Sequence, residues 1–235
     1  MNLEETMSVL ESYGSEQSKK ILSRHGAKEP FFGVKVGDLK RILKKTGKDH
    51  ELALQLYDTG NSDAMYLAGL MADEKRLTKT VLRKWVRKAY WYMLSQYIVA
   101  QLTAETKHGW SLGLEWIDSK KENIASAGWS TLSNIISITP DESLDLKQIE
   151  ALICRIENTI HDGMNREKYA MSGFIICVGS YIIDLHDNAI KAAKRIGEID
   201  VKTATPGCTA PEILVDIEKV KAKDRLGKKR KRARC

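Results

Sequence analysis

The chain has 235 residues, 43% of them hydrophobic and 29% charged, which is enough apolar material for one large folded domain or two small ones. Its net charge of +7 is uneven, because residues 219–235 hold ten Lys or Arg and one acid, a local charge of +9 that leaves about −2 for the rest. The longest apolar run, 174–178, is too short for a membrane span, and the first 14 residues hold acids and no apolar signal stretch, so the composition excludes a membrane protein and predicts a cytoplasmic one.

Apolar residues recur at helical spacing along almost the whole chain, and four prolines are all that interrupt it. Short helices are expected over 3–10 and 17–22, and a turn over 25–33 precedes a helix from Val36 through Leu43. Further helices are expected over 49–58, 62–73, 78–88, 90–104, 107–118, 121–137, 146–160, 166–183 and 185–196. We find no alternating strand pattern. The fold class is therefore all-α, and many helices joined by short polar segments are typical of stacked helical hairpins in an α-solenoid.

Three of the expected helices contain a small residue, then glycine, then a large apolar residue. The three segments are 68–70 (Ala-Gly-Leu), 127–129 (Ala-Gly-Trp) and 172–174 (Ser-Gly-Phe). A glycine inside a helix costs about 1 kcal/mol relative to alanine, so we expect each to be compensated by the close approach of a neighbouring helix. The spacing favours a divergent repeat, although chance spacing in an ordinary bundle gives the same pattern.

The end of the chain departs from this pattern. Residues 200–211 break the helical periodicity, 212–223 form one short amphipathic helix, and a strongly basic segment follows. We therefore expect a solenoid over 1–199 and a second region, 200–235, of loop, short helix and basic tail. Such a tail suits a polyanion, with nucleic acid the commonest, but it also fits a disordered, solubilising end.

Metal and cofactor sites are not indicated. The five histidines lie far apart, and the His-Asp pairs at 161–162 and 186–187 are isolated. Cys154 and Cys177 fall in apolar helical stretches, and no two of the four cysteines, which include Cys208 and Cys235, form a CxxC pair. A Walker-type loop and a dinucleotide fingerprint are both missing, so we expect no metal and no cofactor.

Several segments together resemble the AlkD-like DNA alkylation repair proteins. They are 32–39 (Phe-Gly-Val-Lys-Val-Gly-Asp-Leu), 67–73 (Leu-Ala-Gly-Leu-Met-Ala-Asp), 85–87 (Trp-Val-Arg) with the aromatic cluster after it, and the basic end, 227–235. The resemblance covers nearly the whole chain. It implies a right-handed superhelix of HEAT-like repeats whose concave, basic face holds duplex DNA. Active members of the family are glycosylases that excise positively charged N3- or N7-alkylated purines.

The chain departs from the family where the chemistry is expected. Active members carry two acids in the helix after the Trp-Val-Arg segment, and Tyr92 and Ser95 stand at those positions. An expected arginine corresponds to Ser126, and a later Trp and Arg are missing from 175–179. A carboxylate stabilises the positive charge that builds on the sugar as the glycosidic bond breaks, and neither Tyr92 nor Ser95 supplies one. The resemblance therefore implies a binding groove without the usual catalytic acid.

Candidate DNA contacts combine cations for phosphates with rings for sugars or bases. Helical spacing places Trp85 and Tyr92 on a buried stripe and Trp91 on the same exposed stripe as three cations, so Trp91 is expected to contact DNA. The opening of a helix near Asn165 adds two cations beside free N–H groups, which suit a phosphate, although a solvated first turn is an equal alternative. The expected DNA-binding residues are Lys84, Arg87, Lys88, Tyr90, Trp91, Arg166, Lys168, Lys228, Lys229, Arg230, Lys231 and Arg232.

Three hypotheses follow for function. The first is a monomeric DNA-binding protein of the alkylation repair superfamily that holds duplex, distorted or branched DNA and has lost glycosylase activity. The second is an active glycosylase that uses other residues near Tyr90 to Ser95 to excise alkylated purines. The third is a protein-interaction solenoid whose basic tail is only a solubilising or docking segment. Under the first, deleting 228–234 is expected to weaken DNA binding without unfolding the body.

Overall fold

The structure of the protein, a computed structural model, describes residues 1–202 and 211–234. Most of the loop expected over 200–211 lies outside the described residues, and so do Cys208 and Cys235. The helices of the first half are α1 (Leu3–Tyr13), α2 (Glu16–Arg24), α3 (Val36–Thr46), α4 (His50–Asp58), α5 (Ser62–Met71), α6 (Lys79–Lys88), the π-helix η1 (Met93–Val99) and α7 (Ala100–Ala104). The second half holds α8 (Gly109–Trp116), α9 (Glu122–Ile138), α10 (Leu146–Thr159), α11 (Asn165–Tyr181), α12 (His186–Ile196) and α13 (Ile213–Ala222), with three short 3₁₀ turns, η2 (Asp141–Ser143), η3 (Ile160–Asp162) and η4 (Ile183–Leu185).

The described residues contain helices and no strands, which confirms the all-α prediction. Each helix expected between 49 and 196 is present, with ends that differ by a few residues. The exception is the segment expected over 90–104, which begins as a π-helix because the N–H of Ala100 bonds to the carbonyl of Ser95, five residues earlier. Periodicity alone does not predict this widened turn, which is rare and occurs frequently at functional sites.

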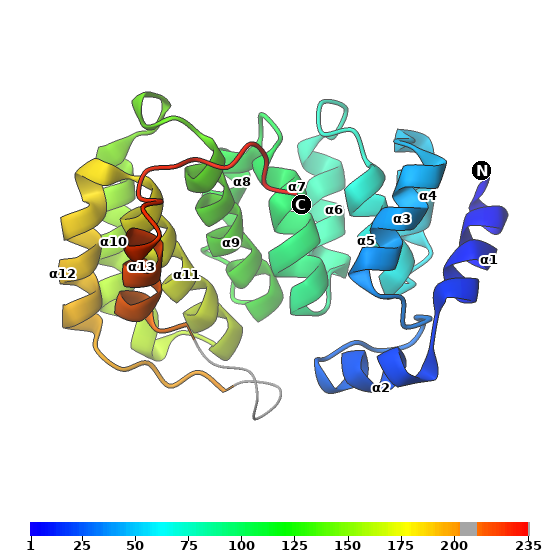
Figure 1. Ribbon diagram of the computed structural model, residues 1–235, viewed down its shortest axis with the longest axis horizontal. Helices are drawn as coiled ribbons and strands as arrows, with labels where there is room; N and C mark the ends of the chain where they lie inside the picture. Colours follow the sequence, from blue (N-terminus) through cyan, green and yellow to red (C-terminus); the bar gives the residue numbers. More distant parts are fainter. Residues whose placement is uncertain (203–210, 235) are drawn as a thin grey trace.

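The helices follow one another across the molecule in chain order and form two rows (Figure 1). We call α5, η1 with α7, α9 and α11 the inner row, because each of these segments packs against the next. The helices that alternate with them along the chain, α4, α6, α8, α10 and α12, form the outer row. Ion pairs join three of the four successive pairs of outer-row helices: Lys84 with Asp58 at 2.8 Å, Arg83 with Glu115 at 2.5 Å, and Arg195 with Glu157. This repeated pairing is the geometry expected of a solenoid.

Two of the three helical glycines are sites of close approach, as expected. A Cβ atom at Gly69 would lie 2.2 Å from Cγ1 of Ile98, and one at Gly128 would lie 2.6 Å from the backbone nitrogen of Ile117. Gly173 is different, because a Cβ atom there would meet nothing within 4 Å. The expectation of close helix packing is therefore wrong for Gly173, which faces open space on α11.

A buried carboxylate fixes the connection before α3. Asp63, in the first turn of α5, accepts hydrogen bonds from the backbone N–H groups of Phe32 at 2.6 Å, Gly33 at 2.9 Å and Val34 at 3.3 Å. Burial raises the pKa of Asp63, and these three donors offset part of that rise. Gly33 adopts a φ of +80°, so a glycine is needed at this turn. The sequence segment around Phe32 thus has a structural role in joining the first helices to α5.

The chain reverses direction after α12. Helix α13 packs against α11 and α12, and its Ile213 and Ile217 join the apolar core of the second half. The tail then runs back across the molecule toward α7 (Figure 1). Within the described residues no single helix is long and apolar enough to cross a membrane; α11 and the segment 183–196 meet the length and composition test only together, with a bend of 119° between them.

Candidate functional site

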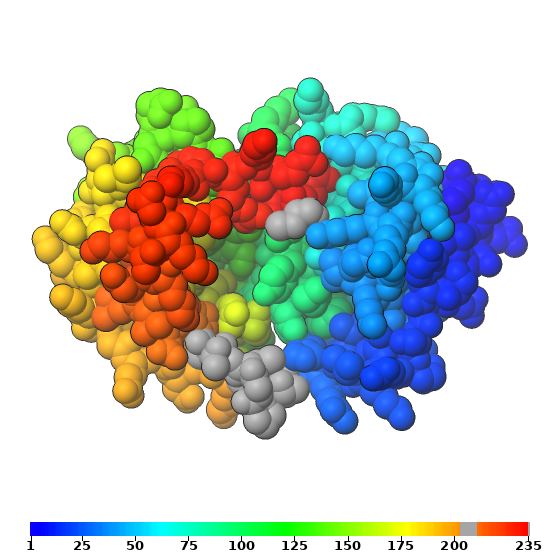
Figure 2. All heavy atoms as spheres, in the orientation of Figure 1, coloured from blue at the N-terminus to red at the C-terminus, as the bar shows by residue number. Residues whose placement is uncertain are grey.

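A cleft of about 250 Å³ opens on the inner row, and we call it the central cleft. The helices η1, α7, α9 and α11 and the tail all contribute to it. Its lining residues are Gln96, Tyr97, Gln101, Ser130, Ser133, Asn134, Tyr169, Ala170, Gly173, Cys177 and Arg230. Figure 2 shows the corresponding hollow beneath the tail, with green and yellow-green residues inside it. Gly173 leaves room in this cleft because it has no side chain, and Tyr97 is 37% exposed there.

Beside the central cleft, an arginine lies between two tyrosine rings. The guanidinium carbon of Arg166 is 4.3 Å from the centroid of Tyr92 and 4.2 Å from that of Tyr169. Its Nη2 donates to Oε1 of Gln96, and Nε2 of Gln96 donates to the carbonyl of Arg166 at 2.9 Å. We call Tyr92, Tyr169, Gln96 and the enclosed guanidinium the arginine box. Burial lowers the pKa of the Arg166 guanidinium, and Tyr169 and other neighbours offset part of that effect.

A carboxylate already occupies the first turn of α11. Oε1 of Glu122 accepts a hydrogen bond from the backbone N–H of Arg166 at 2.8 Å. This corrects the prediction that a DNA phosphate binds these N–H groups through Arg166, because both the amide and the side chain of Arg166 have partners within the protein. Lys168 is partly buried on the same turn, and its contact with DNA stays a prediction.

The two positions that replace the family's acids have different surroundings. Tyr92 forms one wall of the arginine box, and its hydroxyl lies 3.1 Å from Nδ1 of His25. Ser95 is 1% exposed, and its Oγ donates to the carbonyl of Trp91 at 3.2 Å, so its hydroxyl faces its own helix. Neither residue introduces a carboxylate, as expected. Glu122 is the acid that folding brings to the box, and its position in the sequence gives no sign of this.

Tyr90 and Trp91 hold the N-terminal segment in place. The Trp91 ring is 8% exposed, and its Nε1 donates to Oγ of Ser62 at 3.0 Å. The hydroxyl of Tyr90 accepts from the backbone N–H of Lys28 at 2.9 Å and donates to its carbonyl at 2.8 Å. The prediction that Trp91 contacts DNA is wrong, because the ring turns into the core and finds a hydrogen-bond partner on α5. Helical spacing placed Trp91 on an exposed stripe because it assumed an α-helix through a segment that is a turn followed by a π-helix.

The three cations of α6 lie on the outer row. Helix α6 packs against η1 and α9 through its buried face, which carries Trp85, so its exposed residues point away from the central cleft. Lys84 and Lys88 both pair with Asp58, at 2.8 and 2.9 Å, and Arg87 is exposed. These residues do not join the central cleft, and the expectation that they line the same groove as the aromatic residues is wrong.

The tail lies against the inner row. The backbone N–H of Arg230 bonds to the carbonyl of Ser137 at 2.7 Å. Nζ of Lys229 donates to the carbonyl of Ile136 at 2.9 Å and pairs with Asp141 at 2.6 Å. Arg230 lines the central cleft. The remaining cations of this stretch, Lys228, Lys231 and Arg232, are exposed. The tail is therefore an irregular segment that docks on the inner row, and it is not a free end.

Arg234 anchors the tail in the first half of the molecule. Its side chain is 7% exposed and pairs with Glu74 at 2.6 Å and Glu105 at 2.7 Å. Nη1 also donates to the carbonyls of Gly69 at 3.0 Å and Ala72 at 2.9 Å, at the end of α5. The preceding Ala233 is fully buried. Residues 228–234 contain no large apolar side chain with which to dock, and the buried arginine supplies the anchor instead.

The Arg234 anchor makes the free energy of unfolding depend on pH. Burial by itself raises the pKa of Glu74, but its own backbone N–H and the guanidinium of Arg234 outweigh this and lower the pKa to about 2. A lowered carboxyl pKa gives stability that is complete above the unfolded-state pKa and is lost as the pH falls toward the folded-state pKa. We expect the free energy of unfolding to fall by about 1–2 kcal/mol between pH 4.5 and 2, after solvent screening. In urea titrations, Arg234→Met should lose this part of the pH dependence, and an unchanged dependence would contradict the assignment.

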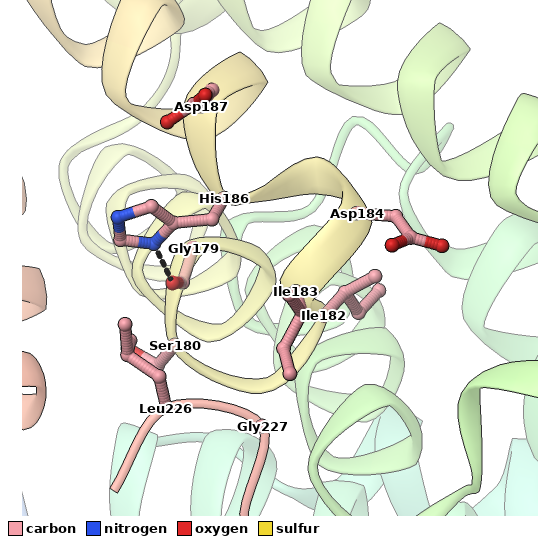
Figure 3. Close-up of a pocket in the computed structure, with 9 residues that line it drawn as sticks. All are labelled: Gly179, Ser180, Ile182, Ile183, Asp184, His186, Asp187, Leu226 and Gly227. Carbon is pink, nitrogen blue, oxygen red and sulfur yellow. Dashed lines mark hydrogen bonds between the residues drawn. The ribbon is translucent and has the colours of Figure 1, made fainter. Parts of the chain in front are cut away.

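A second cavity, also of about 250 Å³, lies where the tail leaves α13 (Figure 3). Leu226 and Gly227 form one side of it, and residues from the end of α11 and the start of α12 form the other. Nδ1 of His186 lies 2.7 Å from the carbonyl of Gly179 (Figure 3), and the backbone N–H of Gly227 bonds to the carbonyl of Ser180. This His186–Asp187 pair is thus part of a helix junction. In the described part of the chain no group of three or more His, Cys, Asp or Glu is arranged to hold a metal ion.

Comparison with known proteins agrees with this architecture. The sequence model described as "DNA alkylation repair enzyme" matches residues 6–207. The uncharacterized proteins Lin0241 of Listeria innocua and Lmo0209 of Listeria monocytogenes are 32% and 31% identical to the chain over 218 residues, which are 90% of the chain and 94% of each relative. A solved structure from "a new family of proteins related to the HEAT-like repeat DNA glycosylases with affinity for branched DNA structures" superposes with a TM-score of 0.92 at 37% identity and covers 100% of both chains. The predicted right-handed superhelix of HEAT-like repeats is confirmed by this likeness.

Proposed function

The chain belongs to the DNA alkylation repair enzyme family, and we propose that it is a DNA-binding member that holds branched or distorted DNA against the inner row and excises no base. The observation that carries the proposal is the central cleft, which combines an exposed tyrosine, polar side chains and Arg230. A ring with exposed surface suits stacking with an unpaired base, and amide and hydroxyl groups suit its polar edges. Bulged DNA offers such a base, and an open junction exposes the ends of its base-pair stacks to the same ring.

The exposed tail cations supply the contacts to the DNA backbone in this proposal. Lys228, Lys231 and Arg232 face solvent along the tail, which borders the hollow in Figure 2. Lys231 and Arg232 also line a polar cleft of about 400 Å³ beside Lys48. Cations along one edge bind phosphates without regard to sequence, and a polar pocket next to them favours DNA with an available base. The affinity for branched DNA recorded for the similar structure supports this choice of substrate.

The proposed loss of base excision rests on the two residues that stand where active members of the family carry acids. The side chain of Ser95 is buried against its own helix, and Tyr92 lies against a guanidinium, so no carboxylate stands at either position to stabilise positive charge on a sugar. Glu122 is the acid beside the arginine box, but its Oε1 is bonded to the backbone of Arg166. Because Glu122 is nonetheless the one favourable observation for an active glycosylase, we retain that activity as the second candidate function.

A binding panel tests the proposal. Purified protein is titrated with duplex, nicked, bulged and four-way junction DNA of one sequence at one salt concentration. We expect bulged and junction DNA to bind at least about tenfold more tightly than duplex, which corresponds to about 1.4 kcal/mol and is the size of one stacked base. Analytical ultracentrifugation of the same samples checks the proposed monomer.

Alkylated duplex DNA is included to detect base release. We expect none above background, and release that disappears in Glu122→Gln would instead establish the second candidate. Equal affinity for every DNA shape would contradict the proposed preference. No binding to any DNA would favour a protein-interaction solenoid.

A further inference from the structure

The arginine box has the features of a ligand site whose occupant belongs to the protein. Two aromatic rings at 4.3 and 4.2 Å lie over the Arg166 guanidinium, which is the separation expected for a planar cation against ring faces. The amide oxygen of Gln96 accepts a hydrogen bond at one edge of the cation. Nε of Arg166 is buried and makes no hydrogen bond with the described residues.

The side chain and the backbone of Arg166 make separate contacts in the box. The contacts that place the first turn of α11 run through its backbone, whose N–H donates to Glu122 and whose carbonyl accepts from Gln96. The guanidinium itself is held by two ring faces and by the amide oxygen of Gln96. The box therefore binds the guanidinium as a cation, largely independently of the chain that brings it.

We infer that the arginine box is a planar-cation site that Arg166 keeps filled. The walls of this site are Tyr92 and Tyr169, and Gln96 reads one edge of its ligand. Its ligand class is a flat, positively charged group the size of a guanidinium. The inference does not depend on DNA binding, because it concerns the box and not the tail.

A consequence follows for the central cleft. Gln96 and Tyr169 belong to both the box and the lining of the cleft, so the resident guanidinium lies directly behind the cleft wall. A second cation placed in the cleft would be repelled by Arg166 and by Arg230. The cleft of the native protein therefore favours neutral or anionic groups, such as an unmodified base and its phosphate, over cationic ones.

Chemical rescue tests the site. Arg166→Ala removes a fragment equal to ethylguanidinium and leaves the backbone contacts of α11 in place. We expect ethylguanidinium to raise the melting temperature of this variant with saturation, because a ligand that binds the folded state stabilises it. Ethylurea has the same flat shape without the charge, and we expect it to bind at least roughly tenfold more weakly than ethylguanidinium. The native protein, whose box is filled, should show neither effect.

Arg155→Ala provides the matched control. Arg155 also lies over a ring, at 5.7 Å from the centroid of Trp129, but its side chain is 38% exposed and has a single ring face. We expect no saturable response of Arg155→Ala to ethylguanidinium. An equal response of both variants, or an equal response of Arg166→Ala to ethylguanidinium and ethylurea, would overturn the inference.

The native chain decides the question if Arg166→Ala does not fold. Phenylglyoxal modifies accessible arginines, and peptide mass spectrometry reports each site separately. We expect Arg166 to react far more slowly than the exposed Arg232, and Tyr169→Leu, which removes one wall, to speed the reaction of Arg166 alone. Equal rates at Arg166 and Arg232 in the native protein, or an unchanged rate at Arg166 in Tyr169→Leu, would show that the box does not hold the cation.

Discussion

Removing residues 228–235 should lower the free energy of unfolding by about 3–5 kcal/mol, a loss that Arg234→Met reproduces in large part. The reason is the pair of carboxylates left behind: the side chains of Glu74 and Glu105 are 24% and 12% exposed, and Arg234 is their shared partner. Removing Arg234 leaves Glu105 without this ion-pair partner and Glu74 with Lys48 at 3.4 Å, and breaking a buried pair from one side costs more than an exposed pair contributes. For a chain of this size the melting temperature should fall by about 10 °C.

Arg195→Met is the matched control for this result. Arg195 pairs with Glu157 on the outer row, but its side chain is 59% exposed, so the change should lower stability far less than Arg234→Met does. Scanning calorimetry or urea unfolding compares the two variants directly. A truncated protein as stable as the full chain would mean that the tail does not dock in solution. It would then favour the disordered end that the composition of the tail also fits.

Replacing Lys228, Lys231 and Arg232 together by glutamine should weaken binding to every DNA shape. Each lost phosphate contact lowers the magnitude of the slope of log K against log salt by about 0.9, so three contacts lower it by about 2–3. At about 0.1 M salt the affinity should fall on the order of 100-fold. Stability should change little, because all three side chains are exposed and the ion pair that Lys228 forms with Asp224 is a surface pair.

The control replaces Lys84, Arg87 and Lys88 on the outer row. This substitution removes the same number of positive charges as the tail variant. We expect their substitution by glutamine to leave the salt slope nearly unchanged, because they point away from the central cleft. Fluorescence anisotropy at four salt concentrations measures both triple variants. A large change in slope for the α6 variant and none for the tail variant would place the DNA on the outer row and reject the proposed binding face.

The sequence by itself determined the fold class, the order of the helices and the family. Helical periodicity is a local property, and the helices of this chain carry it strongly enough that their positions follow from apolar spacing and helix-breaking residues. The close approach at Gly69 and Gly128 was also readable, because a glycine inside a helix has an energetic cost that needs a compensating contact. The replacement of the family's acids by Tyr92 and Ser95 likewise needs no coordinates.

The tertiary structure alone decided which side chains meet. Glu122 and Arg166 are 44 residues apart, and Arg234 lies 160 residues from Glu74, so no spacing rule connects either pair. Trp91 was misplaced because the periodicity argument assumes a regular α-helix, and here a turn and a π-helix rotate its ring into the core. The charge of the tail left a nucleic-acid contact and a disordered, solubilising end both open, and it also allows a buried anchor when two carboxylates and two carbonyls receive it. Long-range electrostatic partners are a property of the folded chain, and they determine here what is a contact surface and what is core.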